Sequence, residues 1–372
     1  MDFTQLIQDL TKGFAGFTPG NALMIAVALI LIYLAIWKEY EPVLLLPIGF
    51  GCLLANLGMS NQTGFMQVIY DAGIKTELFP LLIFIGVGAM IDFSPLLSQP
   101  SLVLLGAAGQ FGIYATLLLA LALKFPLNQA ASIGVIGAID GPTAIFVGSK
   151  LAPEILAPIA VAAYSYMSLI PIIQPPIMKL MTTRKERLIR MEYAPKPVSR
   201  LTLVIFPILV TLLVALVAPD AAPLMAALML GNLLREALVV DRLSKTAQNE
   251  LINIATLFLG LAIGSTMTAQ SFLNVKTLAI LALGLLAFVI DTAAGLLFGK
   301  LMAWLTHGKV NPLIGASGIS AFPMAGRLSA KMALEEDPDN FILMHAMGAN
   351  TAGQLGSVIA GGLLLALLSS VG

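Results

Sequence analysis

Apolar stretches of roughly 17 to 25 residues recur along the whole chain, each about as long as a helix that crosses a bilayer, and they restrict the fold most. Only 11% of the 372 residues are charged. A soluble domain carries about 25% charged residues, so this chain cannot cover itself with a water-facing surface. Because backbone groups in lipid have no water to bind, the stretches predict an all-α polytopic membrane protein.

The apolar stretches and the loops between them divide the chain into regions. The loop at residues 179–200 is strongly basic, and the positive-inside rule places it in the cytoplasm. The predicted membrane segments are about 22–37, 42–57, 79–91, 101–123, 127–149, 154–179, 199–218, 221–240, 247–270, 275–305, 310–331 and 341–371. The predicted regions are an interfacial helix with the first transmembrane helix (1–41), a first membrane repeat (42–180), a basic cytoplasmic loop with a linking helix (181–220) and a second membrane repeat (221–372).

The two halves of the chain contain similar segments. Residues 133–154, IGVIGAIDGPTAIFVGSKLAPE, align with residues 314–335, IGASGISAFPMAGRLSAKMALE, so that Pro142 falls on Pro323. Chance similarity between two segments rich in Gly and Ala is the alternative. We interpret the match as an internal repeat of five segments, preceded in each half by one extra segment.

Each of these matching segments has Gly and Pro at its centre. A broken or re-entrant helix is tolerated in a membrane where it lines a cavity enclosed by protein. If both segments are re-entrant, the two five-segment repeats start on opposite sides of the membrane and are inverted, as in many alternating-access transporters. This topology also places basic residues of the second half in the cytoplasm, namely Arg235, Arg242, Lys245, Lys300 and Lys309. If both segments cross completely, the repeats are parallel, which fits the charges less well.

The stretch GAIDGPTAIFVGSK, residues 137–150, places Asp140 and a helix break in the middle of an apolar segment. A charge at the bilayer midplane costs on the order of 2.5–3.5 kcal/mol on insertion scales, so an acid there indicates a function. Broken helices leave carbonyl oxygens free, and these oxygens together with one carboxylate suit a dehydrated Na⁺. DGP is also an ordinary turn signal, and the alternative is an aspartate that caps a short interfacial loop.

The matching stretch of the second half, NPLIGASGISAFPMAGR, has no acid but carries Asn311, Ser317, Ser320 and Arg327. Amide and hydroxyl oxygens are suitable ligands for Na⁺, although Gly and Ser also allow close helix packing. Arg327 in an apolar setting needs an anion, either a carboxylate of the protein or that of a substrate. A snorkelling arginine at the interface is the alternative.

Further polar side chains lie in apolar surroundings. AYSYMSLIPIIQPPIMK carries Tyr166 ahead of several prolines, and HAMGANTAGQLGS carries Asn350 and Gln354 among glycines. Tyrosines also mark the interfacial belt of membrane proteins. Asp291 is a second acid in an apolar segment, and we hold it as a reserve candidate.

The sequence also argues against several classes of function. It contains no Walker A pattern, so the chain is not expected to hydrolyse a nucleotide. Its net charge is zero without a basic face, which argues against a nucleic-acid partner. Cys52 is the only cysteine, so no intramolecular disulfide or cysteine cluster forms. The residues alone indicate an inverted-repeat membrane transporter coupled to Na⁺ or H⁺, and they do not reveal what drives it.

At GAIDGPTAIF, AYSYMSLIPIIQPPIMK, NPLIGASGISAFPMAGR and HAMGAN the chain resembles the β subunit of the sodium-pumping biotin-dependent decarboxylases. That family includes oxaloacetate, methylmalonyl-CoA and glutaconyl-CoA decarboxylases. The likeness extends over nearly the whole chain. The chain has AID where GAD is common and MAGR where MAAR is common, and neither departure changes a polar residue.

The resemblance implies a membrane subunit that decarboxylates carboxybiotin, exports Na⁺ and consumes a proton from the outer side. A soluble, biotin-carrying carboxyltransferase subunit would first move CO₂ from the substrate to biotin. A small single-span membrane subunit would complete an oligomeric complex in the cytoplasmic membrane. The implied cofactors are therefore Na⁺ and a carboxybiotin presented by the partner.

The resemblance also implies roles for individual residues. Asp140 would bind Na⁺ and exchange it for a proton, and Tyr166 with Ser320 would form a second Na⁺ or proton-relay position. Arg327 would face the carboxylate of carboxybiotin. Asn311 would add a ligand or hold the broken helices. The residues implied at the metal site are Asp140, Tyr166, Asn311, Gly315, Ser320 and Asn350.

Two other classes of function remain open at this point. A free-standing Na⁺-coupled carboxylate transporter or Na⁺/H⁺ antiporter would use Arg327 for a soluble substrate and would work without a biotinyl protein. A non-catalytic membrane anchor would leave the polar groups of both broken segments unexplained.

Overall fold

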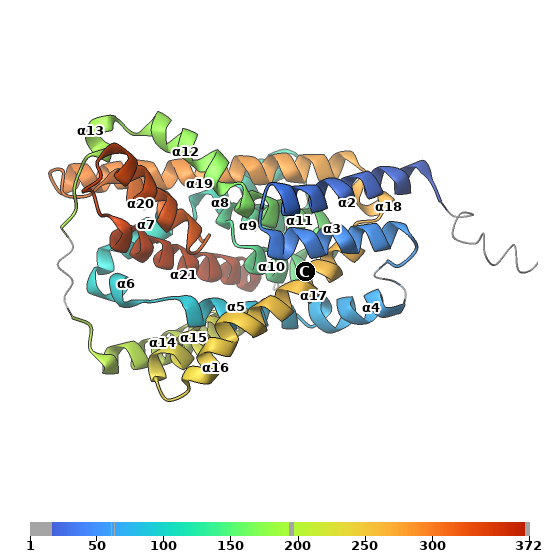
Figure 1. Cartoon of the computed structure of the whole chain (residues 1–372), viewed down its shortest axis with the longest axis horizontal. Helices are drawn as coiled ribbons and strands as arrows, with labels where there is room; N and C mark the ends of the chain where they lie inside the picture. Colours follow the sequence, from blue (N-terminus) through green and yellow to red (C-terminus); the bar gives the residue numbers. More distant parts are fainter. Residues whose placement is uncertain (1–16, 61, 63, 193–196, 369–372) are drawn as a thin grey trace, which may run out of the picture.

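The computed structural model describes residues 17–60, 62, 64–192 and 197–368, which form helices joined by short loops (Figure 1). None of these residues lies in a β-strand. Five of the described helices are long and apolar enough to cross a membrane, or seven if each of two bent pairs counts as one span. The predicted all-α membrane fold is confirmed. The predicted interfacial helix lies outside the described residues.

Most predicted segments coincide with single helices. These helices are α2 (Pro19–Trp37), α3 (Pro42–Asn56), α5 (Leu78–Met90), α14 (Arg200–Val217), α15 (Ala222–Ala237), α17 (Ile252–Ser265), α19 (Val275–Leu305) and α21 (Leu343–Leu368). Proline begins α2 and α3, where the missing N–H is not needed for a helical hydrogen bond. Runs of Leu, Ile, Val and Ala supply the helix-forming, lipid-compatible side chains between these starts.

Other predicted segments are interrupted. Residues 101–123 form α7 (Val103–Ala108) and α8 (Phe111–Ala122), with a break at Gly109 and Gln110. Residues 154–179 form α11 (Leu156–Ser168) and α12 (Ile170–Met181). A short helical segment ahead of α5, made of α4 (Gly64–Tyr70) and η1 (Asp71–Lys75), was not predicted because it is short and carries charges.

The predicted segment 127–149 turns back at its centre. α9 (Leu127–Val135) and η3 (Ile136–Ala138) lead to Ile139, whose φ of +53° is left-handed, and α10 (Gly141–Leu151) follows. Gln129 near the start of α9 donates to Glu154 just beyond α10, with 2.5 Å between Nε2 and Oε1. Both ends of this segment therefore lie at the same end of the molecule, and we call residues 127–151 hairpin 1.

The predicted segment 310–331 also turns back. It consists of η7 (Pro312–Gly318) and α20 (Met324–Glu336), separated by an irregular stretch. Asn311 donates its side-chain N–H to the carbonyl oxygen of Arg187 at 3.0 Å. Glu336 at the other end of the segment binds the same arginine, with 2.7 Å between Oε1 and a guanidinium nitrogen. Both ends lie at one loop, and we call residues 312–336 hairpin 2.

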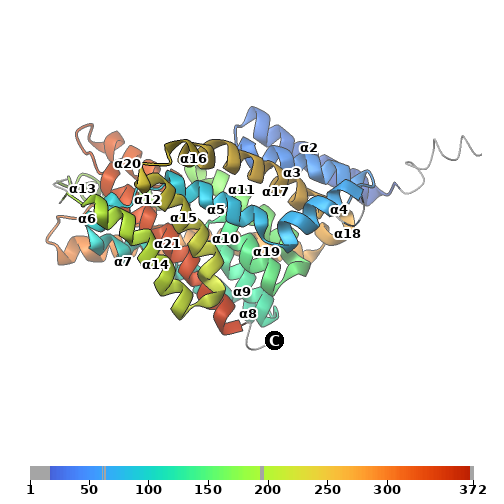
Figure 2. The same ribbon diagram turned by 90° about the horizontal axis from the view of Figure 1, so that it is seen from below.

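The two hairpins meet at their tips. In Figures 1 and 2, α20 lies to the left of α9 and α10. The backbone N–H of Ser320 donates to the carbonyl oxygen of Ala138 at 3.1 Å. Ser320 falls on Ile139 in the repeat alignment, so the two helices break at matching positions. Two hairpins from opposite ends are what inverted repeats predict, and the inversion itself stays a prediction.

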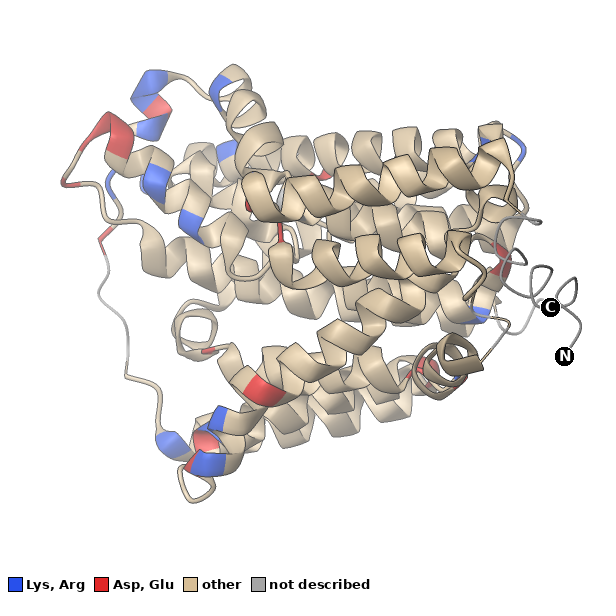
Figure 3. Cartoon of the chain, turned by 45° about the vertical axis from the view of Figure 1, so that its right-hand side comes forward, with Lys and Arg blue, Asp and Glu red and all other residues tan. Residues whose placement is uncertain are grey.

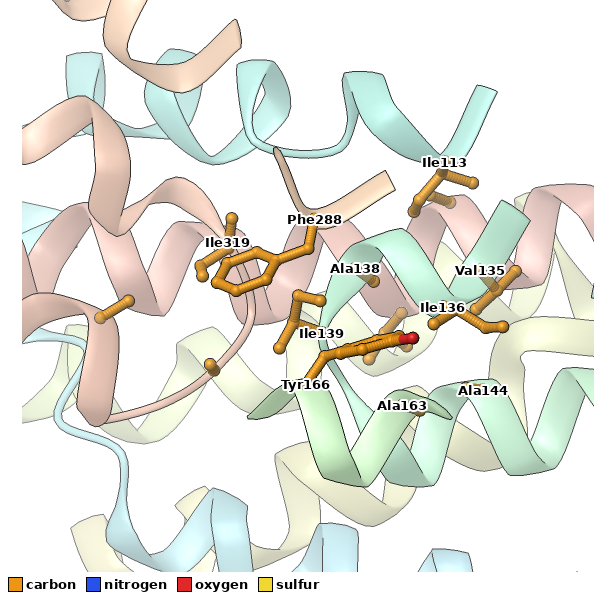
Figure 4. Packing of buried hydrophobic residues seen from close by; sticks show 14 of the residues in the cluster. Ile113, Val135, Ile136, Ala138, Ile139, Ala144, Ala163, Tyr166, Phe288 and Ile319 are labelled. Atoms are coloured by element: carbon orange, nitrogen blue, oxygen red, sulfur yellow. The ribbon is translucent and has the colours of Figure 1, made fainter. Parts of the chain in front are cut away.

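Apolar side chains enclose the hairpin tips. Figure 4 shows Ile139 of hairpin 1 and Ile319 of hairpin 2 beside Phe288 of α19. All three side chains are fully buried. Water is therefore kept from the irregular backbone, and the polar groups of the tips have to find partners within the protein.

The first helix of each half packs against the second helix of the other half. α3 packs on α17, and α5 packs on α15. Glycines bring each pair close: a Cβ on Gly264 would lie 2.3 Å from the carbonyl oxygen of Ile48, and one on Gly231 would lie 1.9 Å from that of Ile85. Such small residues at an interface are typical of helices that associate in membranes. Two repeats related by a two-fold axis are expected to pack in this reciprocal way.

Basic residues gather at one end of the molecule. Figure 3 shows most Lys and Arg positions, in blue, toward one end of the ribbon, and the basic segments α13 (Arg184–Arg187) and α16 (Asp241–Thr246) lie at this end in Figure 1. Lys300 at the end of α19 pairs with Glu186 in the basic loop, with 3.3 Å between Nζ and Oε1. The basic residues of the second half therefore lie at the same end as the basic loop, and the positive-inside rule predicts that this end is cytoplasmic.

Ion pairs attach the basic loop to the end of hairpin 2. Arg190 binds Asp337 through two guanidinium nitrogens, at 2.7 and 2.9 Å from the carboxylate oxygens. The hydrogen bond from Arg190 holds the pKa of the Asp337 carboxyl below its usual value of 3.8. A carboxylate with a lowered pKa in the folded state favours folding when it is ionised.

The first prediction concerns this attachment. We expect Asp337 to stabilise the folded protein fully above pH 3.8. This stabilisation should disappear as the pH falls through the lowered pKa of Asp337. The measurement is the thermal unfolding temperature of the wild type and of Asp337→Asn at a series of pH values from neutral downward. The effects of all other carboxyl groups cancel in the difference between the two unfolding temperatures. The wild type should unfold at a slightly higher temperature near neutral pH, and the two proteins should converge in acid. A difference that is unchanged across this range would contradict the prediction.

Candidate functional site

Asp140 lies at the tip of hairpin 1, immediately before α10. Its side chain is 5% exposed. One carboxylate oxygen, Oδ2, accepts three hydrogen bonds: from Thr143 Oγ1 at 2.6 Å, Gln354 Nε2 at 2.8 Å and Ser357 Oγ at 2.9 Å. The N-terminus of α10 adds a positive helix dipole beside the carboxylate. The site is therefore built to hold a negative charge inside the apolar core.

The local sequence explains why the tip adopts this shape. The left-handed backbone at Ile139 reverses the chain. Pro142 stands in the first turn of α10, where no N–H donor is needed. Gly141 is required, because a Cβ there would lie 2.2 Å from the ring of Tyr164. The tyrosine can pack against the tip only because this residue has no side chain.

A cavity of about 290 Å³ adjoins Asp140. Its lining comes from both hairpin tips, from α21 and from the helices α3, α5, α11 and α17. The polar residues that line it are Glu41, Asp140, Tyr164, Thr256, Ser320 and Gln354. A larger cavity of about 560 Å³ beside α3, α4 and α17 is lined by apolar residues and glycine. The smaller cavity is the better candidate site because it contains the buried acid.

The tip of hairpin 2 is held mainly by α21. Ser320 donates its hydroxyl to the carbonyl oxygen of Gly353 at 2.9 Å, and Asn350 donates its amide N–H to that of Ile319 at 2.8 Å. Asn350, Gln354 and Ser357 stand at i, i+4 and i+7, so one face of α21 contacts both tips. The structure thus brings Asp140, Ser320 and Asn350 to the junction of the two hairpins, while their roles as ligands stay predictions.

Gln110, at the break between α7 and α8, was missed by the sequence interpretation. Its Nε2 lies 3.2 Å from the carbonyl oxygen of Gly318 and 3.3 Å from that of Gly353. The amide therefore donates to a carbonyl oxygen of hairpin 2 and to one of α21, and so joins the two elements. A single Gln in the apolar segment 101–123, directly after a glycine, is the signal that could have identified it.

Other predicted site residues have different surroundings. Asn311 is engaged with the basic loop, and its Oδ1 accepts from the N–H of Leu313. Tyr166 donates its hydroxyl to the carbonyl oxygen of Leu281 on α19. Gly315 allows η7 to approach α19, because a Cβ would lie 2.1 Å from the carbonyl oxygen of Gly295. None of these three residues forms a hydrogen bond with Asp140 in the described structure, so their roles as ligands stay predictions.

Arg327 is exposed on α20. It stands one helical turn beyond Pro323 and Met324, and both of those residues line the cavity. No ion pair of Arg327 is present among the described residues. Arg327 therefore lies near the cavity and forms no ion pair with a described carboxylate of the protein.

The oxygen atoms at the junction fit a monovalent cation. Asp140 supplies the negative charge, and the buried Oε1 of Gln110 and Oδ1 of Asn350 accept no hydrogen bond within the part of the chain described. The described residues contain no group of three or more His, Cys, Asp or Glu side chains placed to hold a metal. One carboxylate together with neutral oxygens is a set of ligands that Na⁺ can use.

Comparisons with known proteins agree over the whole membrane region. A family model described as Na⁺-transporting oxaloacetate decarboxylase beta subunit matches residues 20–368. The chain is 53% identical to methylmalonyl-CoA decarboxylase subunit beta of Veillonella parvula, over 96% of each chain. It is 52% identical to glutaconyl-CoA decarboxylase subunit beta of Acidaminococcus fermentans, over 98% of this chain and 97% of that one. It is 47% identical to oxaloacetate decarboxylase beta chain of Klebsiella pneumoniae, over 97% of each.

Proposed function

Because the chain belongs to the family of β subunits of Na⁺-transporting decarboxylases, the membrane subunits of these sodium pumps, we propose that it decarboxylates carboxybiotin and uses the reaction to export Na⁺. The carboxybiotin is presented on a carrier domain of a partner subunit. The observation that carries the proposal is the buried carboxylate of Asp140, which faces a cavity where two broken helices meet.

Asp140 is proposed to bind Na⁺ and a proton in turn. A carboxylate in an apolar interior favours a state in which its charge is neutralised, and either cation can do this. Three donors on Oδ2 hold the carboxylate in place, while the adjoining cavity gives a cation access to it. Competition between Na⁺ and H⁺ for one carboxylate couples the release of one ion to the binding of the other.

The chemical step needs one proton. The bond between the biotin nitrogen and the carboxylate carbon breaks, CO₂ leaves, and the nitrogen takes the proton. Arg327 is proposed to bind the carboxylate of carboxybiotin near the cavity, because a guanidinium suits a planar carboxylate. Moving one charge outward against the membrane potential costs roughly 2.3 kcal/mol per 100 mV, and decarboxylation supplies this energy.

Alternating access is proposed to move a core against a scaffold. The core contains hairpin 1, hairpin 2 and α21, and the scaffold contains the paired helices α3, α5, α15 and α17. The cavity at Asp140 lies between the two units, so a relative movement would open or close it.

The partners are proposed from the same family relationship. They are a biotin-carrying carboxyltransferase subunit and a small single-span membrane subunit, in an oligomeric complex of the cytoplasmic membrane. The chain has many apolar helices and belongs to a membrane family, so it is a multi-pass membrane protein.

The second prediction tests the proposed function. The purified protein is mixed with a carboxylated biotin-carrier domain, with and without Na⁺, and CO₂ release is measured. We expect release that depends on both the carrier and Na⁺. A protein that gives no release under any condition, yet exchanges Na⁺ for H⁺ or a carboxylate in vesicles without a carrier, would instead be a free-standing transporter.

A further inference from the structure

Asp291 is a buried acid that the proposed mechanism does not use. It lies in the middle of α19, and its side chain is 0% exposed. Among the described residues, Asp140 and Asp291 are the two acids whose side chains are buried in the core. Burial of an isolated, charged carboxylate is unfavourable in free energy, so the position of Asp291 requires a physical explanation.

The two carboxylate oxygens of Asp291 have different surroundings. Oδ1 accepts a hydrogen bond from the backbone N–H of Gly112, in the first turn of α8. Oδ2 is buried and accepts no hydrogen bond within the described part of the chain. The N-terminus of α8 favours a negative charge there, but a single N–H donor does not replace the water lost by a charged group.

The free oxygen of Asp291 lies against hairpin 1. A Cβ on Gly137 would stand 3.0 Å from Oδ2, so the backbone of the hairpin tip covers this oxygen directly. Gly137 precedes Asp140 by three residues, whereas Asp140 itself contacts α21. The tip therefore carries one buried acid, Asp140, which α21 binds, and covers a second buried acid on α19.

No charged side chain lies on the elements closest to Asp291. α8, η3, α9 and η7 contain no Lys, Arg, Asp, Glu or His, and the titratable groups of the helices packed on α19 are tyrosines and Lys179. The tyrosines are Tyr114, Tyr164 and Tyr166. On α19 itself, Lys276 lies over the ring of Phe125 and Lys300 pairs with Glu186.

The interface of α8 and α19 offers Asp291 Oδ2 no side-chain donor within the described residues. The hydroxyl oxygens of Thr116 on α8 and Thr292 on α19 are buried, and neither has a hydrogen bond in the described structure. Neither hydroxyl donates to Asp291, so the buried Oδ2 lacks the donors that would stabilise a charged carboxylate, and the neutral, protonated carboxyl suits this position better. A Na⁺ ion is not favoured, because the backbone of Gly137 occupies the space beside Oδ2.

We propose that Asp291 is a second ionisable site of the transport core, which binds a proton while hairpin 1 is packed on it and releases the proton when the tip moves away. When the tip leaves, water reaches Oδ2, and the carboxyl ionises by giving its proton to that water. When the tip returns, the carboxylate takes a proton again. The inference rests on the proposed function, because it assumes that the hairpin moves during Na⁺ transport.

The experiment compares the wild type with Asp291→Asn in the complete complex reconstituted in vesicles. The amide of the variant still accepts from Gly112 but cannot ionise. The rate of Na⁺-dependent CO₂ release is measured against pH, together with the stabilisation of the protein by Na⁺. Asp291→Ser is a second neutral variant, and Asp241→Asn is the matched control, because Asp241 is 65% exposed and lies outside the core.

We expect both neutral variants to turn over more slowly, on the order of 10- to 100-fold, and to lose one ionisation from the pH profile. Stabilisation by Na⁺ should remain, since Asp140 is intact, and the control should match the wild type. A pH profile that is unchanged in both neutral variants overturns the role of Asp291, whatever the rate. Absence of Na⁺-dependent release from the wild type overturns the proposed function instead, so the two failures are distinguishable.

Discussion

Asp140→Asn is expected to abolish Na⁺-dependent CO₂ release, with a loss on the order of 100-fold or more. The asparagine is nearly isosteric, and its carbonyl oxygen can still accept from Thr143 and Ser357. The fold should therefore survive. What is lost is the charge for which Na⁺ and H⁺ compete, so neither ion can drive release of the other.

Na⁺ binding and turnover should fail together in this variant. Thermal unfolding with and without Na⁺ measures the binding, and CO₂ release measures the turnover. Asp241→Asn again serves as the matched control, since it removes an exposed carboxylate. An Asp140→Asn protein that keeps wild-type release and is still stabilised by Na⁺ would remove Asp140 from the centre of the mechanism.

A cross-link between hairpin 1 and the scaffold is expected to stop turnover. Lys150 near the end of α10 pairs with Glu77 just before α5, with 3.5 Å between Nζ and Oε2. Cysteines at both positions, joined by a short thiol reagent, would tie the hairpin to the scaffold. Lys150 lies ten residues from Asp140 along α10, roughly 15 Å at 1.5 Å per residue, so the ion site itself is not altered.

The expected loss is on the order of tenfold or more, because every transport cycle requires the core to move. Cleavage of a reducible reagent should restore the rate, and the two single-cysteine proteins serve as controls. The native Cys52 is buried, so it does not compete for the reagent. Turnover that is unaffected in fully cross-linked protein would show that hairpin 1 does not move against the scaffold.

The positions of the membrane helices and of both hairpin breaks could be predicted because they depend on local sequence. Runs of Leu, Ile and Val define the spans, and Gly with Pro marks the breaks at Pro142 and Pro323. Asp140 and Ser320 were identifiable for the same reason: polar groups in long apolar stretches are costly.

The partners of these residues could not be predicted, because they come from distant parts of the chain. Gln354 is 214 residues from Asp140, and Gln110 is 208 residues from Gly318. Only the packed structure decides that these amides meet the hairpin tips. The contact of Asn311 with the basic loop was missed for the same reason, because nothing in its own stretch points to Arg187.

The most direct test of the account is Na⁺ accumulation in sealed vesicles that contain the complex with its cytoplasmic side outward. Radioactive Na⁺ inside the vesicles is measured after a carboxylated biotin carrier is added. We predict that Na⁺ accumulates against its gradient only with the carboxylated carrier, and that Asp140→Asn accumulates none. Na⁺ uptake at the same rate without a carrier would contradict the account.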